Sequence, residues 1–254
     1  MRKKFKIKKP FYKKNRFWFF LVFLFSFFLF CYFLFFSEFF SIKEIEIPNL
    51  KSPMKEQIEN TILEIVKENF LKKENIFLFN SEKAKAQILK KFLTIEEVKI
   101  LKKFPKKIEV LVKEREPAFL ICSQNCYLVD KSGILFKEAE NENFLKIEKE
   151  EKFDFVLGEK IFSKDFAQKI LKIKEETEKL EIFSEKVKIE KERAEFETKE
   201  GWKIFFDLTK DVDFQLKKLK ALFEKEISKE KRKNLEYIDL RFGDLASVKY
   251  KNLK

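Results

Sequence analysis

The chain has 254 residues, no histidine, and a formal charge of +13 at neutral pH from 56 basic and 43 acidic side chains. Without histidine it lacks the commonest general base and the commonest metal ligand. This excludes a Ser-His-Asp triad, a Cys-His pair and a His-ligated zinc site.

Residues 1–16 form a short basic tail. Nine of the 56 basic residues lie there and none of the 43 acids does, which leaves 47 basic against 43 acidic side chains in the rest of the chain. A basic segment beside a membrane is attracted to the anionic cytoplasmic leaflet. We therefore interpret the high net charge as a membrane feature and not as a nucleic-acid-binding surface.

Residues 17–36, FWFFLVFLFSFFLFCYFLFF, carry no charge, and eleven of these twenty side chains are Phe. A helix of this length is roughly 30 Å long, which matches the hydrocarbon core of a bilayer. The alternative is a cleaved signal peptide, but its apolar region is shorter and ends at small residues, whereas this run ends at Phe35-Phe36-Ser37-Glu38. We expect a single transmembrane helix over 17–37. Its basic flank predicts a cytoplasmic N-terminus, with the bulk of the chain outside.

Residues 39–115 follow the order strand, helix, helix, strand, strand. Apolar side chains alternate over 42–47, recur at helical spacing over 54–66 and over 84–92, and alternate again over 98–100 and 108–112. The two last strands meet near Pro105, and the segment 75–80 is predicted to pack under both helices. This pattern predicts a compact α+β module with its helices on one face of a sheet.

Strand patterns dominate residues 116–254. A meander is expected over 118–122, 126–130, 134–136 and 144–147, followed by a helix over 161–180, three antiparallel strands over 187–206, a helix over 212–227, and strands over 235–242 and 245–250. On the strand 235–242, Ile238 and Phe242 should share one face, and Asp239 and Arg241 the other. We expect Asp239 and Arg241 to form a structural surface ion pair, which contributes about 0–1 kcal/mol.

Cys122 and Cys126 flank a three-residue loop between two apolar runs, which is typical of a hairpin. A disulfide is permitted in an exported domain, and in a loop this short it would contribute about 2 kcal/mol at most. The alternative is a pair of reduced, half-buried thiols. The sequence leaves both open, because the geometry decides between them.

Four stretches behind the apolar run carry a resemblance to a known family: NIFLFN (75–80), FPKKIEV (104–110) leading into EREPA (114–118), YLVDKSGILF (127–136) and YIDLRF (237–242). In this order they are similar to the FtsQ/DivIB family of bacterial cell-division proteins, and the resemblance covers nearly the whole chain. It implies an α+β architecture: a single transmembrane helix, a POTRA domain (βααββ) over 39–115, and a β-rich FtsQ/DivIB-type domain with two helices over 116–254.

The resemblance further implies a non-enzymatic divisome scaffold in the cytoplasmic (inner) membrane at the division septum. Such a scaffold binds small single-span proteins of the FtsB/DivIC and FtsL type and helps control septal peptidoglycan synthesis. No catalytic residue, cofactor or metal is expected, since the sequence has no Gly-rich phosphate loop, nucleophile elbow or ligand-spaced Cys cluster. One alternative is a membrane-anchored cell-wall enzyme that uses a carboxylate pair. Another is a POTRA receptor for an outer-membrane barrel, which usually carries several POTRA repeats.

The last strand is the predicted partner site, because an edge strand leaves N–H and C=O groups available to an added strand. The family's partner is bound beside the closing strands, onto which six residues align: Phe242, Ala246, Ser247, Val248, Lys249 and Tyr250. Lys249 stands where the family often has a small residue. Tyr250 is the expected anchor, since a half-exposed aromatic supplies contact area and a polar tip. The alternative is that residues 243–254 are a frayed tail.

Overall fold

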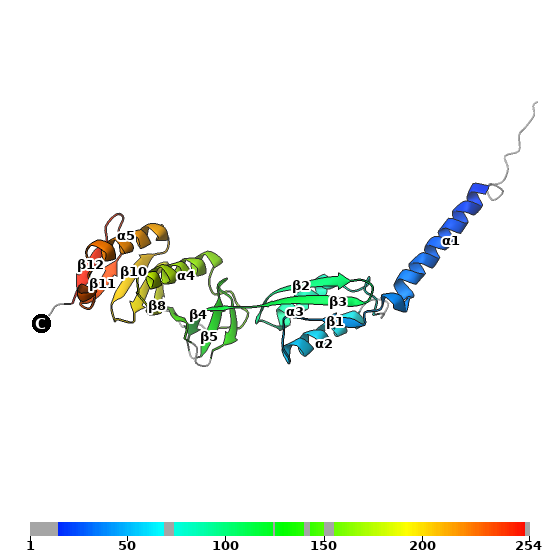
Figure 1. Ribbon diagram of the computed structural model, residues 1–254, viewed down its shortest axis with the longest axis horizontal. Coiled ribbons are helices and arrows are strands. Elements are labelled where there is room, and N and C mark those ends of the chain that lie inside the picture. Colours follow the sequence, from blue (N-terminus) through cyan, green and yellow to red (C-terminus); the bar gives the residue numbers. More distant parts are fainter. Residues whose placement is uncertain (1–14, 69–73, 124, 140–142, 150–154, 252–254) are drawn as a thin grey trace, which may run out of the picture. The chain divides into compact units, whose positions relative to one another are not determined.

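The structure is a computed structural model that describes residues 15–68, 74–123, 125–139, 143–149 and 155–251 (Figure 1). The chain divides into two units, the first ending at Lys113 and the second beginning at Glu114. Nearly all of the predicted basic tail, and Gln124 of the predicted Cys122–Cys126 loop, lie outside the described residues.

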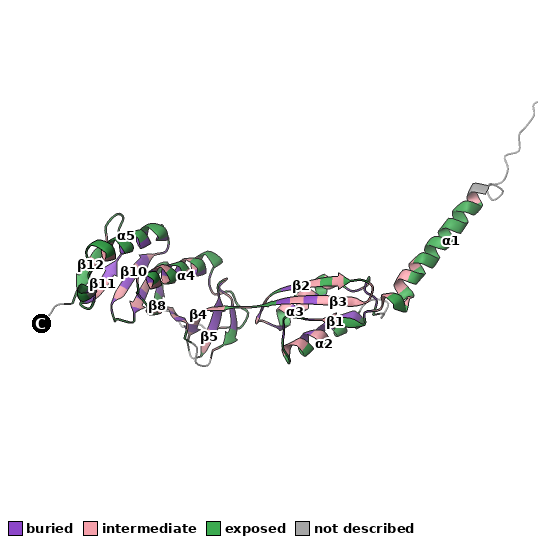
Figure 2. Cartoon of the chain, in the orientation of Figure 1, coloured by how far each residue is buried: buried purple, intermediate pink, exposed green. Residues whose placement is uncertain are grey.

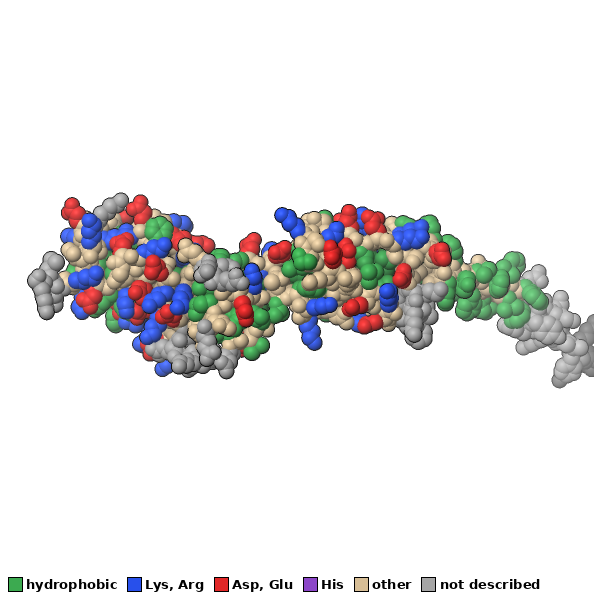
Figure 3. Space-filling model, turned by 90° about the horizontal axis from the view of Figure 1, so that it is seen from below, with side chains coloured by type: hydrophobic (Ala, Val, Ile, Leu, Met, Phe, Trp, Pro, Cys, Tyr) green, Lys and Arg blue, Asp and Glu red, His purple; other side chains and the backbone are tan. Residues whose placement is uncertain are grey.

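The first element is α1 (Asn15–Phe36), the helix that the apolar run predicts. Its segment Phe17–Phe36 is long and apolar enough to cross a membrane, and none of it is buried within the protein. Figure 2 shows α1 as mostly exposed, and Figure 3 shows that its visible surface is hydrophobic. Over the rest of the first unit and over the second unit, basic and acidic side chains are interspersed (Figure 3). An apolar helix that no protein covers is stable in lipid rather than in water.

The rest of the first unit confirms the predicted βααββ order. A short 3-10 turn, η2 (Glu38–Phe40), leads to β1 (Glu44–Glu46), α2 (Met54–Lys67), α3 (Ser81–Lys91), β2 (Ile95–Lys103) and β3 (Lys107–Glu114). The three strands form one sheet in the order β1-β3-β2, and β1 runs parallel to β3. The side chain of Asn80 caps α3 by accepting a hydrogen bond from the N–H of Lys83 (3.0 Å). Asn is a favoured N-cap residue because its side-chain oxygen can satisfy a free N–H group of the first helical turn.

The core of the first unit lies between the two helices and the sheet. Each element supplies apolar side chains whose spacing predicted it. Most of them are buried, among them Ile58, Ile62, Ala84, Ile88, Val98, Ile108 and Val110, while Ile45, Met54 and Ile100 are partly buried and pack against this core. From the connection between the helices, Ile76 and Phe79 join this core. The prediction that this connection packs under the helices therefore holds for these two residues, but Phe77 between them is 40% exposed.

The second unit is built on a nine-stranded sheet in the order β12-β11-β10-β9-β8-β7-β4-β5-β6. Its strands are β4 (Pro117–Cys122), β5 (Cys126–Asp130), β6 (Leu135–Glu138), β7 (Leu145–Lys149), β8 (Ser184–Glu190), β9 (Arg193–Thr198), β10 (Lys203–Asp207), β11 (Leu235–Asp239) and β12 (Ser247–Tyr250). Its helices are α4 (Lys164–Lys179), α5 (Val212–Lys225) and the one-turn α6 (Lys229–Arg232).

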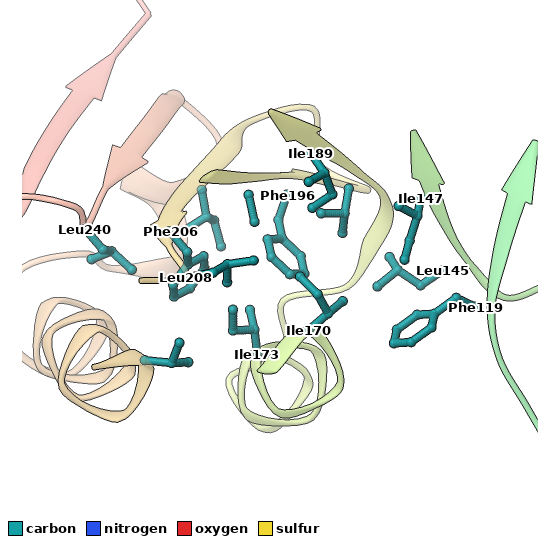
Figure 4. Close-up of a cluster of buried hydrophobic side chains, with 14 of the residues drawn as sticks. Phe119, Leu145, Ile147, Ile170, Ile173, Ile189, Phe196, Phe206, Leu208 and Leu240 are labelled. Carbon is teal, nitrogen blue, oxygen red and sulfur yellow. The ribbon is translucent and has the colours of Figure 1, made fainter. Parts of the chain in front are cut away.

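The helices α4 and α5 cover the same face of this sheet (Figure 4). Ile170 and Ile173 of α4 point toward Phe196 and Phe206 of the central strands, and all four side chains are fully buried. Burial of a side chain of this size contributes about 1.5–3 kcal/mol. The apolar stripe that predicted α4 is thus the face that closes the core of the second unit.

Two expectations about the second unit are wrong. The predicted meander ends at β6, because β7 pairs in parallel with β4 and with β8 and so joins the two halves into one sheet. The strand predicted over 235–242 ends at Asp239. The alternation of buried and exposed side chains therefore does not extend to Phe242, the last residue of the predicted strand. Ile238 is buried on the core face, whereas Phe242 is 58% exposed.

Candidate partner-binding site

The last strand, β12, lies at one end of the nine-stranded sheet and has a neighbour only on one side among the described strands. It pairs antiparallel with β11, with Ile238 opposite Val248 and Asp239 opposite Ser247. The strand β11 in turn runs parallel to β10, which requires the crossover through α5. The structure therefore has a strand over Ser247–Tyr250, within the segment 243–254 that the alternative describes as a frayed tail.

The outer side of β12 offers backbone groups for pairing. Just after the strand, the N–H of Lys251 donates to the carbonyl of Asn234 (2.8 Å), so it points toward β11. Alternate residues of an antiparallel strand direct their backbone groups to opposite sides. The N–H groups of Val248 and Tyr250 therefore point away from β11, toward the open edge.

Five of the six predicted site residues lie together at this edge. Ser247, Lys249 and Tyr250 are exposed, while Ala246 and Val248 are half-buried and pack against the core. The sixth, Phe242, lies in the connection between β11 and β12 and is 58% exposed. The sequence missed one residue of this surface: Leu245, in the same connection, is 75% exposed.

Lys249 connects β12 to the neighbouring strand β11 through two side-chain contacts. Its Nζ lies 2.8 Å from a carboxylate oxygen of Glu236 and 5.6 Å from the ring centre of Tyr237, both on β11. The hydrogen bond to Glu236 raises the pKa of Lys249, and the charge of that carboxylate acts in the same direction. A lysine here closes a cross-strand contact that a small residue could not make.

Lys218, on α5, is the residue that organises the connection before β12, and the sequence analysis missed it. Its Nζ donates to the carbonyl oxygens of Leu240 (2.7 Å), Gly243 (2.8 Å) and Leu245 (2.9 Å), and more weakly to that of Phe242 (3.2 Å). An ammonium group has three protons, so these four acceptors share them. Burial lowers the pKa of Lys218. No local pattern signals this role, because the partners are 22 to 27 residues away.

The ion pair of Asp239 and Arg241 is bidentate and partly buried, not a pair on the surface. Oδ1 of Asp239 accepts from Nε of Arg241 at 2.8 Å, and Oδ2 accepts from Nη2 at 2.5 Å. Asp239 is 5% exposed. The hydrogen bonds that Arg241 donates to Asp239 raise the pKa of Arg241. Lys210 donates to the carbonyl of Arg241 at 2.7 Å, so the end of β11 is held by charged groups on both sides.

At the other end of the sheet, Cys122 and Cys126 are joined by a disulfide in the structure. They are directly opposite each other in the β4–β5 hairpin, as the flanking apolar runs predict. Among the described residues, no group of three or more His, Cys, Asp or Glu side chains could hold a metal ion.

Comparison with known proteins agrees with this architecture. Residues 40–115 match the POTRA domain, FtsQ-type. The chain is 34% identical over 105 residues to "Cell division protein DivIB" of Clostridium acetobutylicum, an alignment that covers 41% of this chain and 39% of that protein. It is 29% identical over 131 residues to "Cell division protein DivIB" of Clostridium botulinum, covering 50% of this chain and 48% of that protein.

These alignments span less than half of the length of either relative. The matched POTRA domain nevertheless coincides with the βααββ module, and it follows directly on a membrane-length helix. The β-rich second unit with its two main helices completes the architecture that the sequence predicts. Together, the FtsQ-type POTRA domain and the similarity to two DivIB cell-division proteins support the resemblance of this chain to the FtsQ/DivIB family.

Proposed function

We propose that this chain is a non-enzymatic scaffold of the cell-division machinery that binds small single-span division proteins through the open edge of β12. The observation that carries the proposal is the geometry of this edge: an ordered end strand with outward N–H groups, flanked by the exposed side chains of Phe242, Leu245 and Tyr250. An extended segment can pair with such an edge through its backbone, while the flanking side chains give specificity.

The proposed partners are the extracytoplasmic segments of FtsB/DivIC-type and FtsL-type proteins. In this proposal α1 spans the cytoplasmic membrane once, the N-terminal tail is cytoplasmic, and both folded units lie outside, at the septum. Partner binding at β12 then couples the chain to the control of septal peptidoglycan synthesis.

A cell-wall enzyme with a carboxylate pair is the rival proposal, and the buried carboxylates of the described residues do not favour it. Asp130 and Asp239 are the two buried acidic residues there, and each is bound to an arginine. They lie on β5 and β11, which are six strand spacings apart in the sheet. At about 4.8 Å per spacing they are roughly 29 Å apart, far beyond the ~5–10 Å between the carboxylates of a glycosidase.

The test is a titration of the full chain in lipid nanodiscs with the soluble segment of a single-span division protein of the FtsB/DivIC type. Val248→Pro removes an outward N–H and should weaken binding by about tenfold or more, because one added-strand hydrogen bond is lost and the ring obstructs the approach. Val248→Thr is the matched control, since it keeps the N–H and the branched shape. Equal affinity of the wild type and the proline variant, with unchanged circular dichroism, would move the partner site away from β12.

A further inference from the structure

A row of aromatic rings continues from the end of α1 onto the first unit. Phe33 of α1 lies 5.9 Å from Phe40 of η2, measured between ring centres. Phe40 lies 5.0 Å from Phe77, which lies 5.1 Å from Phe104 in the turn between β2 and β3. Three parts of the chain that are far apart in the sequence, residues 33–40, Phe77 and Phe104, thus place their aromatic side chains in one contiguous row.

The outer members of this row face solvent. Phe77 is 40% exposed and Phe104 is 56% exposed, and Phe39, beside Phe40, is 52% exposed. Their neighbours in the same connection, Ile76 and Phe79, are buried in the core. The core is therefore complete without these three rings. A contiguous exposed apolar patch of this kind marks a contact surface.

Asn75 fixes the position of this patch relative to the end of α1. Its side-chain amide donates to the carbonyls of Leu34 (2.8 Å) and Phe35 (3.2 Å), which belong to the last turn of the helix. Its Oδ1 accepts from the N–H of Phe77 (2.8 Å), and Asn75 itself is 3% exposed. Carbonyls of a last helical turn have no partner within the helix, so a side chain that binds them is an end cap.

The capped carbonyls also mark a boundary in the membrane. The apolar run ends at Phe36, so residues 34–36 lie where the hydrocarbon core gives way to the headgroups. Phe77 is only two residues from Asn75, at most about 7 Å along the chain. The exposed rings are consequently held at the depth of the membrane interface by the same residue that caps the membrane helix.

Basic side chains border the patch. Nζ of Lys106 lies 5.6 Å from the ring centre of Phe39. Lys102 and Lys103 directly precede Phe104, and there Nζ of Lys102 donates to the carbonyl of Phe79 (2.7 Å) and Nζ of Lys103 pairs with Glu109 (3.2 Å). Aromatic rings that enter the boundary between headgroups and acyl chains, with lysines that meet anionic headgroups, are the combination by which protein surfaces bind bilayers. This chemistry fits a lipid surface better than a protein groove.

We propose that Phe39, Phe77 and Phe104 insert into the headgroup region of the outer face of the membrane, next to α1, and there form a second membrane attachment of the POTRA domain. The proposal rests on α1 being a membrane span, but it does not depend on any partner at β12. It gives a function to the exposed phenylalanines that neither the core nor the sheet edge uses.

Depth-dependent fluorescence quenching in the full chain tests this proposal. In a Trp18→Phe background, the other native tryptophan, Trp202, is fully buried in the second unit and serves as an internal reference. One tryptophan is then added by Phe77→Trp, Phe104→Trp or the control Glu97→Trp. Glu97 is exposed on β2, seven residues before Phe104, or roughly 23 Å away along an extended strand.

The probe is phosphatidylcholine in nanodiscs, brominated or unbrominated at the first carbons of the acyl chain. Bromine should quench roughly half or more of the added emission of F77W and F104W, because the inserted rings reach the acyl boundary. The emission of E97W should stay unchanged. Quenching of F77W and F104W that does not exceed that of E97W overturns the proposal. A blue shift of their emission without quenching would also overturn it, because it would assign the patch to a protein contact. Unchanged Trp202 emission confirms that each variant is folded.

Discussion

The guanidinium of Arg115 donates a hydrogen bond to the carboxylate of Asp130, and the two side chains are 13% and 3% exposed. The second carboxylate oxygen of Asp130 accepts from the backbone N–H groups of Ser132 (2.8 Å) and Ile134 (2.9 Å). One buried carboxylate therefore binds the start of the second unit to the turn between β5 and β6. Because all of these donors satisfy it, the charge of Asp130 is tolerated in the interior.

Arg115→Met should destabilise the second unit by about 3–5 kcal/mol, since it leaves the buried carboxylate of Asp130 without its charged partner. Urea unfolding followed by the fluorescence of Trp202, which is buried in the same unit, measures this change. Lys203→Met is the matched control: Lys203 pairs with Glu195 at 2.5 Å, but the two side chains are 45% and 25% exposed. That pair should contribute about 0–1 kcal/mol. Equal costs for the two variants would contradict the structural role of Arg115.

Lys218→Met should loosen the connection between β11 and β12 without unfolding α5. Hydrogen bonds to a charged group contribute about 1.5–3 kcal/mol, so amide hydrogen exchange over residues 240–250 should accelerate by about tenfold or more. Exchange in β9 and β10 should not change. Lys220→Met, on the same helix, removes only an exposed pair with Glu224 at 3.8 Å and should leave residues 240–250 protected. Protection that survives in the Lys218 variant would show that β12 holds its position by strand pairing alone.

Orientation in the membrane is predicted from the basic tail. A periplasm-active reporter fused after Lys254 should be active, because basic residues that precede a first span stay in the cytoplasm. Replacing the basic residues of the tail with Gln or Ser should reduce that activity, whereas replacing an equal number of exposed lysines on α4 should not. Activity of a cytoplasm-specific reporter at the same position would reverse the proposed topology and the proposed function with it.

Local patterns predicted most of the fold because each element carries its own periodicity. The stripe that predicted α4 is the face containing Ile170 and Ile173, and the alternation that predicted β3 buries Ile108 and Val110. Pairing between strands was harder to predict. A parallel neighbour such as β7 beside β4 depends on a long-range choice that the residues of β7 do not encode by themselves.

The sequence predicted the strand of the candidate site but not the side chains that hold this strand and the preceding connection in place. Ser247 to Tyr250 could be placed because a strand pattern and a resemblance both pointed to the chain end. Lys218 could not, because an isolated lysine on an amphipathic helix looks like a solvated side chain until the crossover brings carbonyls to it. The burial of Asp239 was not predicted either. The alternation correctly placed Asp239 and Ile238 on opposite faces of the strand, but it could not show that Asp239 is buried where it pairs with Arg241.

The bridge between Cys122 and Cys126 predicts a simple mass difference. The exported, purified chain should be two hydrogens lighter before reduction than after it, with Cys31 as the single free thiol before reduction and all three cysteines as free thiols after it. Replacing both bridged cysteines with Ser should cost about 2 kcal/mol at most, since the closed loop is short. Two alkylatable thiols at these positions in the freshly exported chain would contradict the bridge.

Tyr250 is expected to be the anchor of the partner at the open edge. It is 38% exposed at the end of β12, opposite the buried Leu235, so its ring extends beyond a backbone that the sheet holds in place. Truncation of an anchoring aromatic typically costs 2 kcal/mol or more, so Tyr250→Ala should weaken partner binding by about 30-fold. The stability of the unit should change little, because Tyr250 is neither a member of the core nor one of the side chains packed against it.

Two further variants separate the contributions at this edge. Tyr250→Phe keeps the ring area and should retain most of the affinity, unless the hydroxyl group makes a buried hydrogen bond in the complex. Leu245→Ser removes the most exposed apolar side chain of the preceding connection. It should add its own loss of binding free energy to that of Tyr250→Ala if the partner covers both side chains, and should cause no loss if the partner covers only Tyr250. Calorimetric titration of the full chain in nanodiscs measures all three. If Tyr250→Ala binds the partner as the wild type does, while Val248→Pro does not, the partner is held by backbone pairing and Tyr250 is not its anchor.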